Sequence, residues 1–468
     1  MKFLTLLLAT FYFATAAQSA DRPNIVLILA DDLGWRALSC YGSDYHETPH
    51  LDALAQDGVR FTDAYSASPV CSPTRASILT GKHPARLNMT IWRESAKKRG
   101  NRKLLEPVAL DSLPPSETTF PELLKDTGYY NIHIGKWHVG DATGYPQVHG
   151  FHQNIGGTLW GAPQSFWYPY NGDDYFSDWR YVPDLEPGQE GDYLTDALTD
   201  KAIEAIEEQA ATESPFFINL WYHSVHTPIE GKPELVEYYR KKLRPHHKQR
   251  NPHYAAMVHS LDENVGRALD KLDELGLREN TLVIFTSDNG GFINTGKLHP
   301  DLPIANNSPL RSGKGSCYEG GIRVPLIVSG PEVTKGATNG SSVISSDLFF
   351  TLLDAAGISN GSNHGDDGVS LSPILANPTA TLERDTLPFH YPHYYRTTTP
   401  VTAIRKGDWK LLEYYEDGRV ELYNLQRDLG ETEDLSESRP EIARMLQKEL
   451  RAWKAEVNAS EPELNSQR

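Results

Sequence analysis

The sequence is poor in cysteine, in positive charge and in apolar runs long enough to cross a membrane. It has 45 lysines and arginines against 62 aspartates and glutamates, a formal net charge of -17 at pH 7. Nucleic-acid binding depends on clustered basic side chains, so no nucleic-acid partner is expected. Beyond the N-terminus no stretch approaches the roughly 20 apolar residues that a bilayer requires, which excludes a membrane span in the mature chain.

The N-terminal residues have the order typical of a secretory signal peptide. Lys2 precedes an apolar stretch, residues 3–17, and small residues follow as far as Ala20. The stretch is short for a membrane anchor, and the small residues suit cleavage. We therefore expect a mature chain that is secreted or periplasmic.

The cysteine count is odd, because the chain has only Cys40, Cys71 and Cys317. In an oxidising compartment at most one disulfide can form among them. At least one thiol is therefore left over and needs another explanation.

Four apolar segments rich in β-branched residues end at polar side chains: residues 23–30, 129–134, 215–221 and 281–286. Continuous apolar runs of this kind are typical of strands buried on both faces of a parallel sheet. Helical periodicity lies between them, for example in residues 258–275. This alternation predicts an α/β fold with a large, mixed, mostly parallel sheet sandwiched by helices.

The pattern changes after about residue 375. Short strands are expected at residues 401–404, 409–412 and 420–423, and they predict a small antiparallel sheet. An amphipathic helix that begins at Pro440 should pack on this sheet. The predicted parts of the chain are a signal peptide, a large α/β domain and a C-terminal α+β subdomain, residues 1–20, 21–375 and 376–468.

Oxygen-bearing side chains follow two of the predicted strands. Asp31 and Asp32 follow the first strand, and Asp288 and Asn289 follow the strand at residues 281–286. Ligands bind at the carboxyl ends of strands in such sheets, and three carboxylates this close repel one another without a cation. Each pair alone could cap a helix or form a turn, but together they favour a Ca²⁺ site.

Cys71-Ser72-Pro73-Thr74-Arg75 precedes a segment, residues 76–81, that predicts a short helix whose N-terminus favours negative charge at Cys71. This stretch resembles the signature of the sulfatase family: Cys or Ser, any residue, Pro or Ala, any residue, Arg, then a helix that ends in Thr-Gly. Further blocks of that family follow in order, at residues 135–138, 226–228, 288–290, 314 and 319–325. The resemblance covers about residues 22–430.

The resemblance implies an alkaline-phosphatase-like fold and a type I, formylglycine-dependent sulfatase. Cys71 would be oxidised to formylglycine (3-oxoalanine) by a separate formylglycine-generating maturation enzyme. One hydroxyl of the hydrated aldehyde would attack sulfur and the second would expel sulfate, whereas an ordinary serine sulfate would be a dead end. Cys40 and Cys317 could then pair or stay free, which the sequence does not decide.

The family also implies roles for single residues. The residues that would hold one Ca²⁺ per chain are Asp31, Asp32, Cys71, Asp288 and Asn289. The cation would act as a Lewis acid and a template, and Arg75 and Lys136 would stabilise the diol and the sulfuryl group.

The remaining roles concern protons. His138 would take the proton from the second hydroxyl when sulfate leaves, and His226 with Lys314 would serve the leaving alcohol. A lone histidine or lysine at a strand end is usually structural, so the prediction depends on the whole set of motifs in family order.

The expected substrate is a sulfated saccharide. Residues 223–234 resemble bacterial polysaccharide sulfatases, some of which remove 4-sulfates from galactose-type sugars. Recognition of the sugar should come from outside the sulfate pocket, in the basic run 93–103, the aromatic loop 156–181 and the segment 391–396. The predicted substrate-binding residues are Arg93, His223, His393 and Arg396. The aromatic loop is either a packed insertion or a platform for sugar rings.

Two alternatives belong to other functional classes. One is a phosphomonoester or phosphonate hydrolase of the same superfamily; its two-zinc members need additional His and Asp ligands, and the sequence shows no such cluster. The other is a binding protein that keeps the sheet without catalysis, which requires that Cys71 is never converted.

Overall fold

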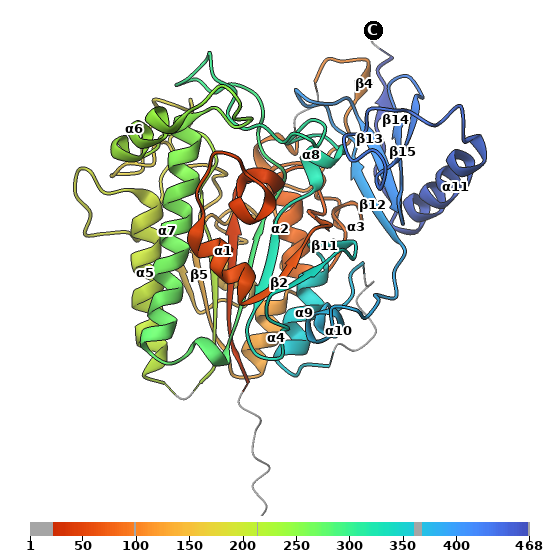
Figure 1. Ribbon diagram of the computed structural model, residues 1–468. Helices are drawn as coiled ribbons and strands as arrows, with labels where there is room; N and C mark the ends of the chain where they lie inside the picture. The colour runs from red at the N-terminus through yellow and green to blue at the C-terminus, as the bar shows by residue number, and fades with distance from the viewer. Residues whose placement is uncertain (1–21, 98–99, 213, 360–366, 467–468) are drawn as a thin grey trace, which may run out of the picture.

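The structure, a computed structural model, describes residues 22–97, 100–212, 214–359 and 367–466. An eight-stranded sheet with helices on both faces forms the large part of the molecule, and a smaller sheet lies at one end of it (Figure 1). The predicted signal peptide, residues 1–20, lies outside the described residues. Among the residues described, no helix is long and apolar enough to cross a membrane.

The predicted strands of the large sheet are confirmed. They are β1 (Asn24–Ala30), β5 (Tyr130–Gly135), β7 (Phe216–Trp221) and β8 (Thr281–Ser287), all parallel and in the spatial order β8-β1-β7-β5. The complete order is β10-β2-β9-β8-β1-β7-β5-β6, with β9 antiparallel to both of its neighbours. The other four strands are β2 (Gly58–Phe61), β6 (Gln153–Ile155), β9 (Leu326–Ser329) and β10 (Ala337–Asn339).

Alternate residues of β1 enter the two hydrophobic cores on either side of the sheet. Val26 and Ile28 belong to one core, whereas Ile25 and Leu27 belong to the other. Because both faces are covered, the strand is apolar throughout, as its sequence indicated. The helices on the first face are α1 (Pro49–Gln56), α5 (Leu194–Ala210) and α7 (Pro252–Glu274). Those on the second are α2 (Cys71–Thr80), α4 (Phe120–Asp126), α9 (Asp347–Ala355) and α10 (Ser372–Ala376).

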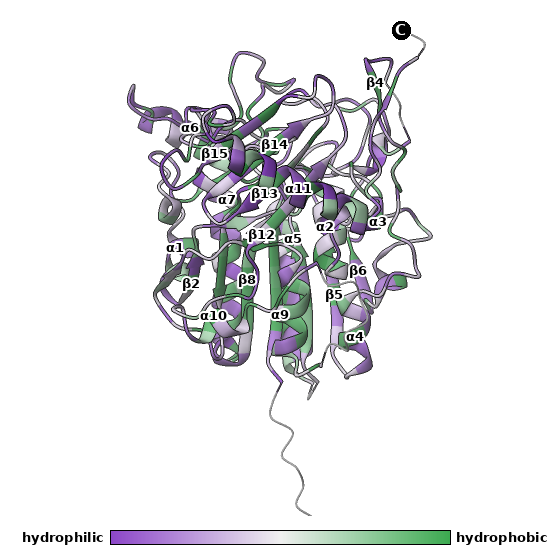
Figure 2. Cartoon of the chain, turned by 90° about the vertical axis from the view of Figure 1, so that its right-hand side faces the viewer, coloured by the Kyte–Doolittle hydropathy of each residue, from purple (hydrophilic) through white to green (hydrophobic). Residues whose placement is uncertain are grey.

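The C-terminal antiparallel sheet and its helix are also confirmed. The strands are β12 (Thr386–Tyr391), β13 (Val401–Lys406), β14 (Trp409–Tyr414) and β15 (Val420–Asn424), paired in chain order. Leu446 and Leu450 of α11 (Pro440–Glu456) pack on one face, and the sheet lies above the end of the large sheet in Figure 2. The domain boundary that we predict between residues 375 and 376 falls in the last turn of α10 and stays a prediction.

The remaining elements are short, apart from one helix of ten residues. They are η1 (Trp35–Ala37), η2 (Ser39–Tyr41), β3 (Ala64–Tyr65), α3 (Pro84–Leu87), η3 (Arg93–Ser95), β4 (Leu104–Leu105), η4 (Pro146–His149), α6 (Pro233–Lys242), η5 (Arg278–Asn280), α8 (Glu319–Ile322), β11 (Val343–Ile344) and β16 (Glu463–Leu464).

A fully buried group of charges, the junction cluster, joins the two sheets. Lys410 of β14 lies 2.8 Å from both Glu319 and Glu431, and none of the three side chains is exposed. Arg323 contacts Glu319 at 2.6 Å from the other side. Buried charges of this kind depend on one another, because each lost its hydration on folding.

All three cysteines are free, so the Cys40–Cys317 bond that the sequence left open is not formed. Cys40 packs against the core on the α7 side of the large sheet. Cys317 is fully buried in a different cluster, which lies between the large part of the molecule and the C-terminal sheet. The two thiols therefore belong to separate packing environments.

Candidate active site

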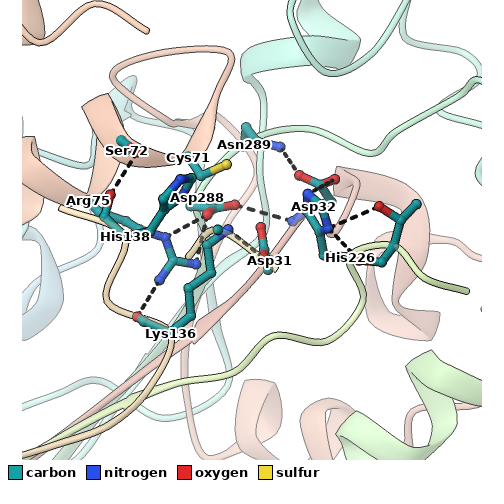
Figure 3. A network of polar contacts seen from close by, with 12 residues as sticks. Asp31, Asp32, Cys71, Ser72, Arg75, Lys136, His138, His226, Asp288 and Asn289 are labelled. Carbon is teal, nitrogen blue, oxygen red and sulfur yellow. Dashed lines mark hydrogen bonds and ion pairs between the residues drawn. The ribbon is translucent and has the colours of Figure 1, made fainter. Parts of the chain in front are cut away.

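The ends of four neighbouring strands meet at one edge of the sheet. Ala30 pairs with Ser287, so the pair Asp31 and Asp32 comes to lie beside Asp288 and Asn289, as expected from the sequence. Lys136 follows β5 directly, and its N–H donates to the carbonyl of Trp221 at the end of β7. Figure 3 shows these side chains converging, with Cys71 above Asp288 and Asp31.

Each of the three carboxylates has a cationic partner. Asp31 lies 2.6 Å from the Lys136 ammonium, and Asp32 lies 2.6 Å from that of Lys314. Asp288 accepts from Nε of Arg75 at 2.8 Å. The backbone N–H of Asp32 also donates to Asp288, at 3.2 Å, which holds the Asp288 carboxylate against the chain at Asp32.

The three carboxylates differ in proton affinity. Burial, with the charge of Asp288, raises the pKa of Asp31 to about 8. Burial acts on Asp32 as well, but Lys314 and His226 outweigh it and lower its pKa to about 2. Without a further cation, Asp31 therefore holds a proton at neutral pH, because burial and the charge of Asp288 outweigh the charge of Lys136.

The donor set fits a calcium ion. Asp31 Oδ1 and Asn289 Oδ1 are buried and have no hydrogen-bond partner. Ligand atoms of Asp31, Asp32 and Cys71 lie within 4.8 Å of one another, and no second such group of His, Cys, Asp and Glu occurs among the described residues. Carboxylate and amide oxygens are the ligands that Ca²⁺ prefers, and a divalent cation would satisfy both orphaned oxygens.

Cys71 is the first residue of α2, which contains the helix predicted over residues 76–81 but begins earlier and ends at Thr80. Its side chain is buried, and the Lys314 ammonium lies 3.7 Å from Sγ. Burial raises the pKa of the Cys71 thiol, although Lys136 and Lys314 oppose the effect. An unmodified thiol with a raised pKa is a poor nucleophile at neutral pH, so the position needs further activation.

Arg75 lies one turn along α2 and is fully buried. Its Nη1 donates to the carbonyl of Lys136 at 3.0 Å, in addition to the ion pair with Asp288. The guanidinium also lies over the ring of Trp221, 5.0 Å from its centroid. The sequence did not mark Trp221 as part of the site, because it reads as the last residue of a buried strand.

His138 is held in an unusual backbone conformation, with a φ of 60°. The Ser72 hydroxyl donates to its carbonyl at 2.7 Å, which ties the residue to the start of α2. Its Nε2 lies 2.8 Å from a carboxylate oxygen of Glu94. Glu94 was not expected in the site from the sequence, because it stands in a basic run and belongs to no family block.

Two histidines follow β7. His226 Nε2 lies 3.6 Å from Asp32, while its Nδ1 is 2.8 Å from the carbonyl of Thr227. His223 is buried, and neither ring nitrogen has a hydrogen-bond partner. Burial, together with the nearby charges of Lys136 and Arg75, lowers the pKa of His223 far below its usual value, so this ring is neutral.

The other predicted substrate-binding residues separate into two kinds. Arg93 is half-buried; its backbone N–H donates to Ser72 at 3.3 Å, and its guanidinium lies 3.8 Å from Asp141. Arg396 is exposed and is the last residue of the segment 391–396. His393, in contrast, is buried, with Thr90 2.8 Å and Glu106 3.6 Å from its ring nitrogens. These contacts hold the ring in place, and the predicted role of His393 in substrate binding stays a prediction.

The aromatic loop combines the two interpretations that the sequence left open. Phe166 and Tyr170 are buried in the core beside α5 and α7, as in a packed insertion. Trp179 is 59% exposed and Tyr181 is 38% exposed, so the outer end of the loop presents aromatic rings to solvent. Between them Arg180 lies over the ring of Phe176, 3.6 Å from its centroid.

The C-terminal part of the chain also reaches this edge. Tyr395 makes an edge-to-face contact with Trp92, with ring centroids 5.5 Å apart. A Cβ on Gly315, whose φ is +85°, would lie 2.0 Å from the Tyr395 ring. Only glycine fits there, and Thr397 donates to the carbonyl of the adjacent Lys314 at 2.7 Å.

Comparison with known proteins gives matches along most of the chain. The model of the sulfatase family matches residues 23–358, and that of the C-terminal region of N-sulphoglucosamine sulphohydrolase matches residues 313–456. A protein of Formosa agariphila named sulfatase is 33% identical, over 95% of this chain and 91% of its own. The N-acetylgalactosamine-6-sulfatase of Rattus norvegicus is also 33% identical, over 84% and 72% respectively.

Solved structures agree with these matches. The crystal structure of Ps i-CgsB in complex with k-i-k-neocarrahexaose superposes with a TM-score of 0.77 at 30% identity, and the match covers 92% of each chain. The structure of BT4656 in complex with D-glucosamine-2-N,6-O-disulfate has a TM-score of 0.70 at 21% identity, over 93% of this chain and 98% of that one. The second likeness concerns the fold alone.

Proposed function

Because the chain belongs to the sulfatase family, and is therefore a sulfuric ester hydrolase, we propose that it desulfates a carbohydrate with a formylglycine made from Cys71 and one Ca²⁺. The observation that carries the proposal is the position of Cys71. It begins α2, and its Sγ lies 3.7 Å from the Lys314 ammonium. The same sulfur lies within 4.8 Å of carboxylate oxygens of Asp31 and Asp32.

The modified residue and the metal would supply two kinds of chemistry. A hydrated formylglycine at position 71 offers one hydroxyl to attack sulfur and a second from which sulfate is expelled. A Ca²⁺ would be held by Asp31, Asp32, Asp288, Asn289 and the residue at position 71, and it would supply a Lewis acid for the sulfuryl group.

Buried cations prepare the site for an anion. Arg75, Lys136 and Lys314 lie at most 6% exposed, so their charges act with little screening from water. Their positions are fixed by ion pairs with the carboxylates before any ligand arrives. Such preorganised charge stabilises a sulfuryl group in the transition state more than in the ground state.

Two histidines at separate positions are proposed to transfer protons. His226, beside Asp32 and Lys314, is proposed to act on the oxygen of the leaving sugar as an acid or electrostatic partner. Burial and the charge of Lys314 lower the pKa of His226 to about 3, so its ring is neutral in the free enzyme. His138, whose Nδ1 is buried without a partner, is proposed to accept the proton of the second hydroxyl.

For the sugar, we propose a galactose-type residue of a polysaccharide, with the 4-sulfate as the position cleaved. The segment 223–234 supports it by resemblance, and the rat relative is named for N-acetylgalactosamine, though for its 6-sulfate. Arg93, His223, His393 and Arg396 remain the proposed sugar-binding residues. A signal peptide and a formylglycine-generating maturation enzyme complete the proposal for an exported enzyme.

Removing calcium should abolish activity, and the affinity with which the metal rebinds should depend on pH. The proton on metal-free Asp31, whose pKa is raised to about 8, must leave when Ca²⁺ binds. The apparent Ca²⁺ affinity should therefore weaken by up to about tenfold for each pH unit below about 8. Calorimetric titration of chelator-treated protein at several pH values measures this.

The same proton contributes to the pH dependence of the stability of the metal-free protein. Because the folded-state pKa of Asp31 lies above its unfolded value of 3.8, the group stabilises the fold at low pH. That contribution is lost as pH rises through about 8.

The Asp31→Asn variant is the control for the calcium titration, since it has no proton to release at this position. A Ca²⁺ affinity that does not change with pH would contradict the assignment of Asp31.

Replacing Arg93 or Arg396 with Ala should weaken sugar binding. Each side chain offers a charged hydrogen-bond donor outside the sulfate pocket, and such a bond contributes about 1.5 to 3 kcal/mol. We expect KM to rise about 10-fold or more with little change in kcat, because the contact is made in both ground and transition states. Arg451→Ala, on the exposed face of α11, is the matched control. Neutral results for both variants would remove this surface from the proposal.

The test of the function as a whole is product release. The mature chain, expressed with a formylglycine-generating enzyme, is assayed on sulfated galactose, N-acetylhexosamine, fucose and uronic acid sugars and on the matching phosphate esters. Sulfate release from one sugar position, absent in Cys71→Ala, is the expected result. Faster phosphate release would favour a phosphoester hydrolase instead, and binding without turnover by converted enzyme would favour a binding protein.

A further inference from the structure

We propose that Glu94 is a positioning residue that holds His138 in the tautomer with its proton on Nε2, so that Nδ1 is the proton acceptor of the site. The inference rests on the proposed function for its catalytic consequence, but the tautomer itself can be measured without it. Neither the family motifs nor the comparisons mark Glu94.

The contact between the two side chains is short and shielded from water. His138 Nε2 lies 2.8 Å from Glu94 Oε2, and the side chains are 3% and 17% exposed. Burial would raise the pKa of Glu94, but the contact with His138, a backbone hydrogen bond and the charge of Arg180 hold it well below its ordinary value. Burial also lowers the pKa of His138 to about 4, so the ring is neutral at pH 7. An ionised carboxylate can only accept, so the ring nitrogen that faces it must carry the proton.

The second carboxylate oxygen is also engaged. Glu94 Oε1 accepts from the backbone N–H of Gly161 at 3.3 Å. Gly161 packs directly on the imidazole, since a Cβ there would lie 2.2 Å from Cε1 of His138. The same glycine therefore orients the carboxylate and packs against the ring.

The opposite ring nitrogen is left available. Nδ1 of His138 is buried and has no protein partner. The backbone of His138 is held on both sides, by its N–H to Thr158 at 3.1 Å and by the Ser72 hydroxyl on its carbonyl at 2.7 Å. In Figure 3 the ring lies beside Cys71 and Arg75, the residues around which the sulfuryl group would be held.

This arrangement has a chemical consequence at the step that frees sulfate. The second hydroxyl must lose its proton as the bond from carbon to the sulfated oxygen breaks and the aldehyde re-forms. A neutral imidazole with a bare Nδ1 can take that proton, and the resulting cation is stabilised by the carboxylate on Nε2. In the other tautomer Nδ1 carries a hydrogen and cannot act as the base.

Glu94→Gln separates these possibilities. The amide oxygen can keep the N–H of Gly161, which leaves the amide NH₂ facing Nε2 of His138. An NH₂ group donates, so the ring should move its proton to Nδ1. The readout is the ¹⁵N spectrum of the imidazole nitrogens at neutral pH in unconverted protein, with the His138 signals identified by their loss in His138→Ala. We expect protonated Nε2 in the parent protein and protonated Nδ1 in Glu94→Gln.

The kinetic expectation follows from the loss of the base. In converted enzyme, kcat of Glu94→Gln should fall about 10²–10⁴-fold, the usual contribution of general acid–base catalysis, with KM changed less than about threefold. Glu94→Asp keeps the charge and should recover part of the rate. Glu263→Gln is the matched control, since Glu263 lies 3.4 Å from His259 on the exposed side of α7. Thermal unfolding of each variant shows whether the fold is kept.

Each outcome decides one part of the proposal: the tautomer, the catalytic role or the function on which it rests. An unchanged His138 spectrum in Glu94→Gln, or a proton on Nδ1 in the parent protein, overturns the inference whatever the activity. A folded Glu94→Gln enzyme with a flipped tautomer and a normal kcat overturns the catalytic part. If converted parent enzyme releases no sulfate from any ester, the proposed function fails, while the spectra still decide the tautomer.

Discussion

Replacing Cys71 with serine should leave an enzyme that cannot turn over. Serine fits the start of α2 and retains a hydroxyl, but it offers only one oxygen where a hydrated aldehyde offers two. Attack on sulfur would give a serine sulfate with no second hydroxyl to expel the group. We expect steady-state sulfate release to fall at least about 10⁴-fold, which corresponds to about 5 kcal/mol in the barrier. Rates under substrate saturation measure it, and mass spectrometry counts the sulfuryl groups held by each chain.

Two controls make that result interpretable. Mass spectrometry must show that the introduced serine is not itself oxidised by the maturation enzyme. Thermal unfolding must match that of the parent, since the change is isosteric in a buried position. Repeated turnover by the serine variant within about 100-fold of the parent rate would contradict the need for a second hydroxyl.

Replacing Lys410 with methionine should cause the largest loss of stability. Lys410 is the shared cation of Glu319 and Glu431, and removing it leaves Glu431 buried without a counter-charge beside Glu319, which keeps only Arg323. Breaking a buried ion pair in this way costs about 3–5 kcal/mol. Urea and thermal unfolding of the purified proteins measure the loss.

The loss should grow with pH. Burial, together with Glu319, already raises the pKa of Glu431 to about 7 in the parent protein, despite the opposing charge of Lys410. Without Lys410 it rises further, and a raised folded-state pKa gives stability that is lost as pH increases. The destabilisation should therefore be larger at about pH 8.5 than at about pH 6.

A second substitution tests the same cause. Adding Glu431→Gln to Lys410→Met removes one of the stranded charges and should recover part of the stability. A single variant that loses less than about 1 kcal/mol would show that the junction cluster does not hold the two sheets together.

Much of the site could be predicted because its residues follow directly after predicted strands. The four apolar runs fixed which residues lie at the carboxyl edge, and the pairing of Ala30 with Ser287 put Asp31 and Asp32 beside Asp288. A parallel sheet brings the ends of neighbouring strands together whatever the loops do. The helix predicted over residues 76–81 is also present, but it begins earlier, at Cys71, because the whole helix is buried and packing extends it beyond the local signal.

The residues that the sequence did not reveal act through side-chain contacts between distant segments. Glu94 reaches His138 over a separation of 44 residues, and no local pattern encodes that pairing. Trp221 looks like any aromatic residue in a buried strand until Arg75 is seen over its ring. The burial of His393 against Glu106 could not be predicted either, because it depends on a contact between segments far apart in the chain.

The most direct test of the account measures sulfate release against the extent of Cys71 conversion. Preparations made with different amounts of the maturation enzyme are analysed by mass spectrometry for formylglycine at position 71, and each is assayed with calcium on the best sulfated sugar of the panel. We expect the rate to rise in proportion to the formylglycine fraction and to pass through zero at no conversion. A rate that is independent of that fraction, or absent in fully converted enzyme on every sulfated sugar and polymer tried, would contradict the mechanism.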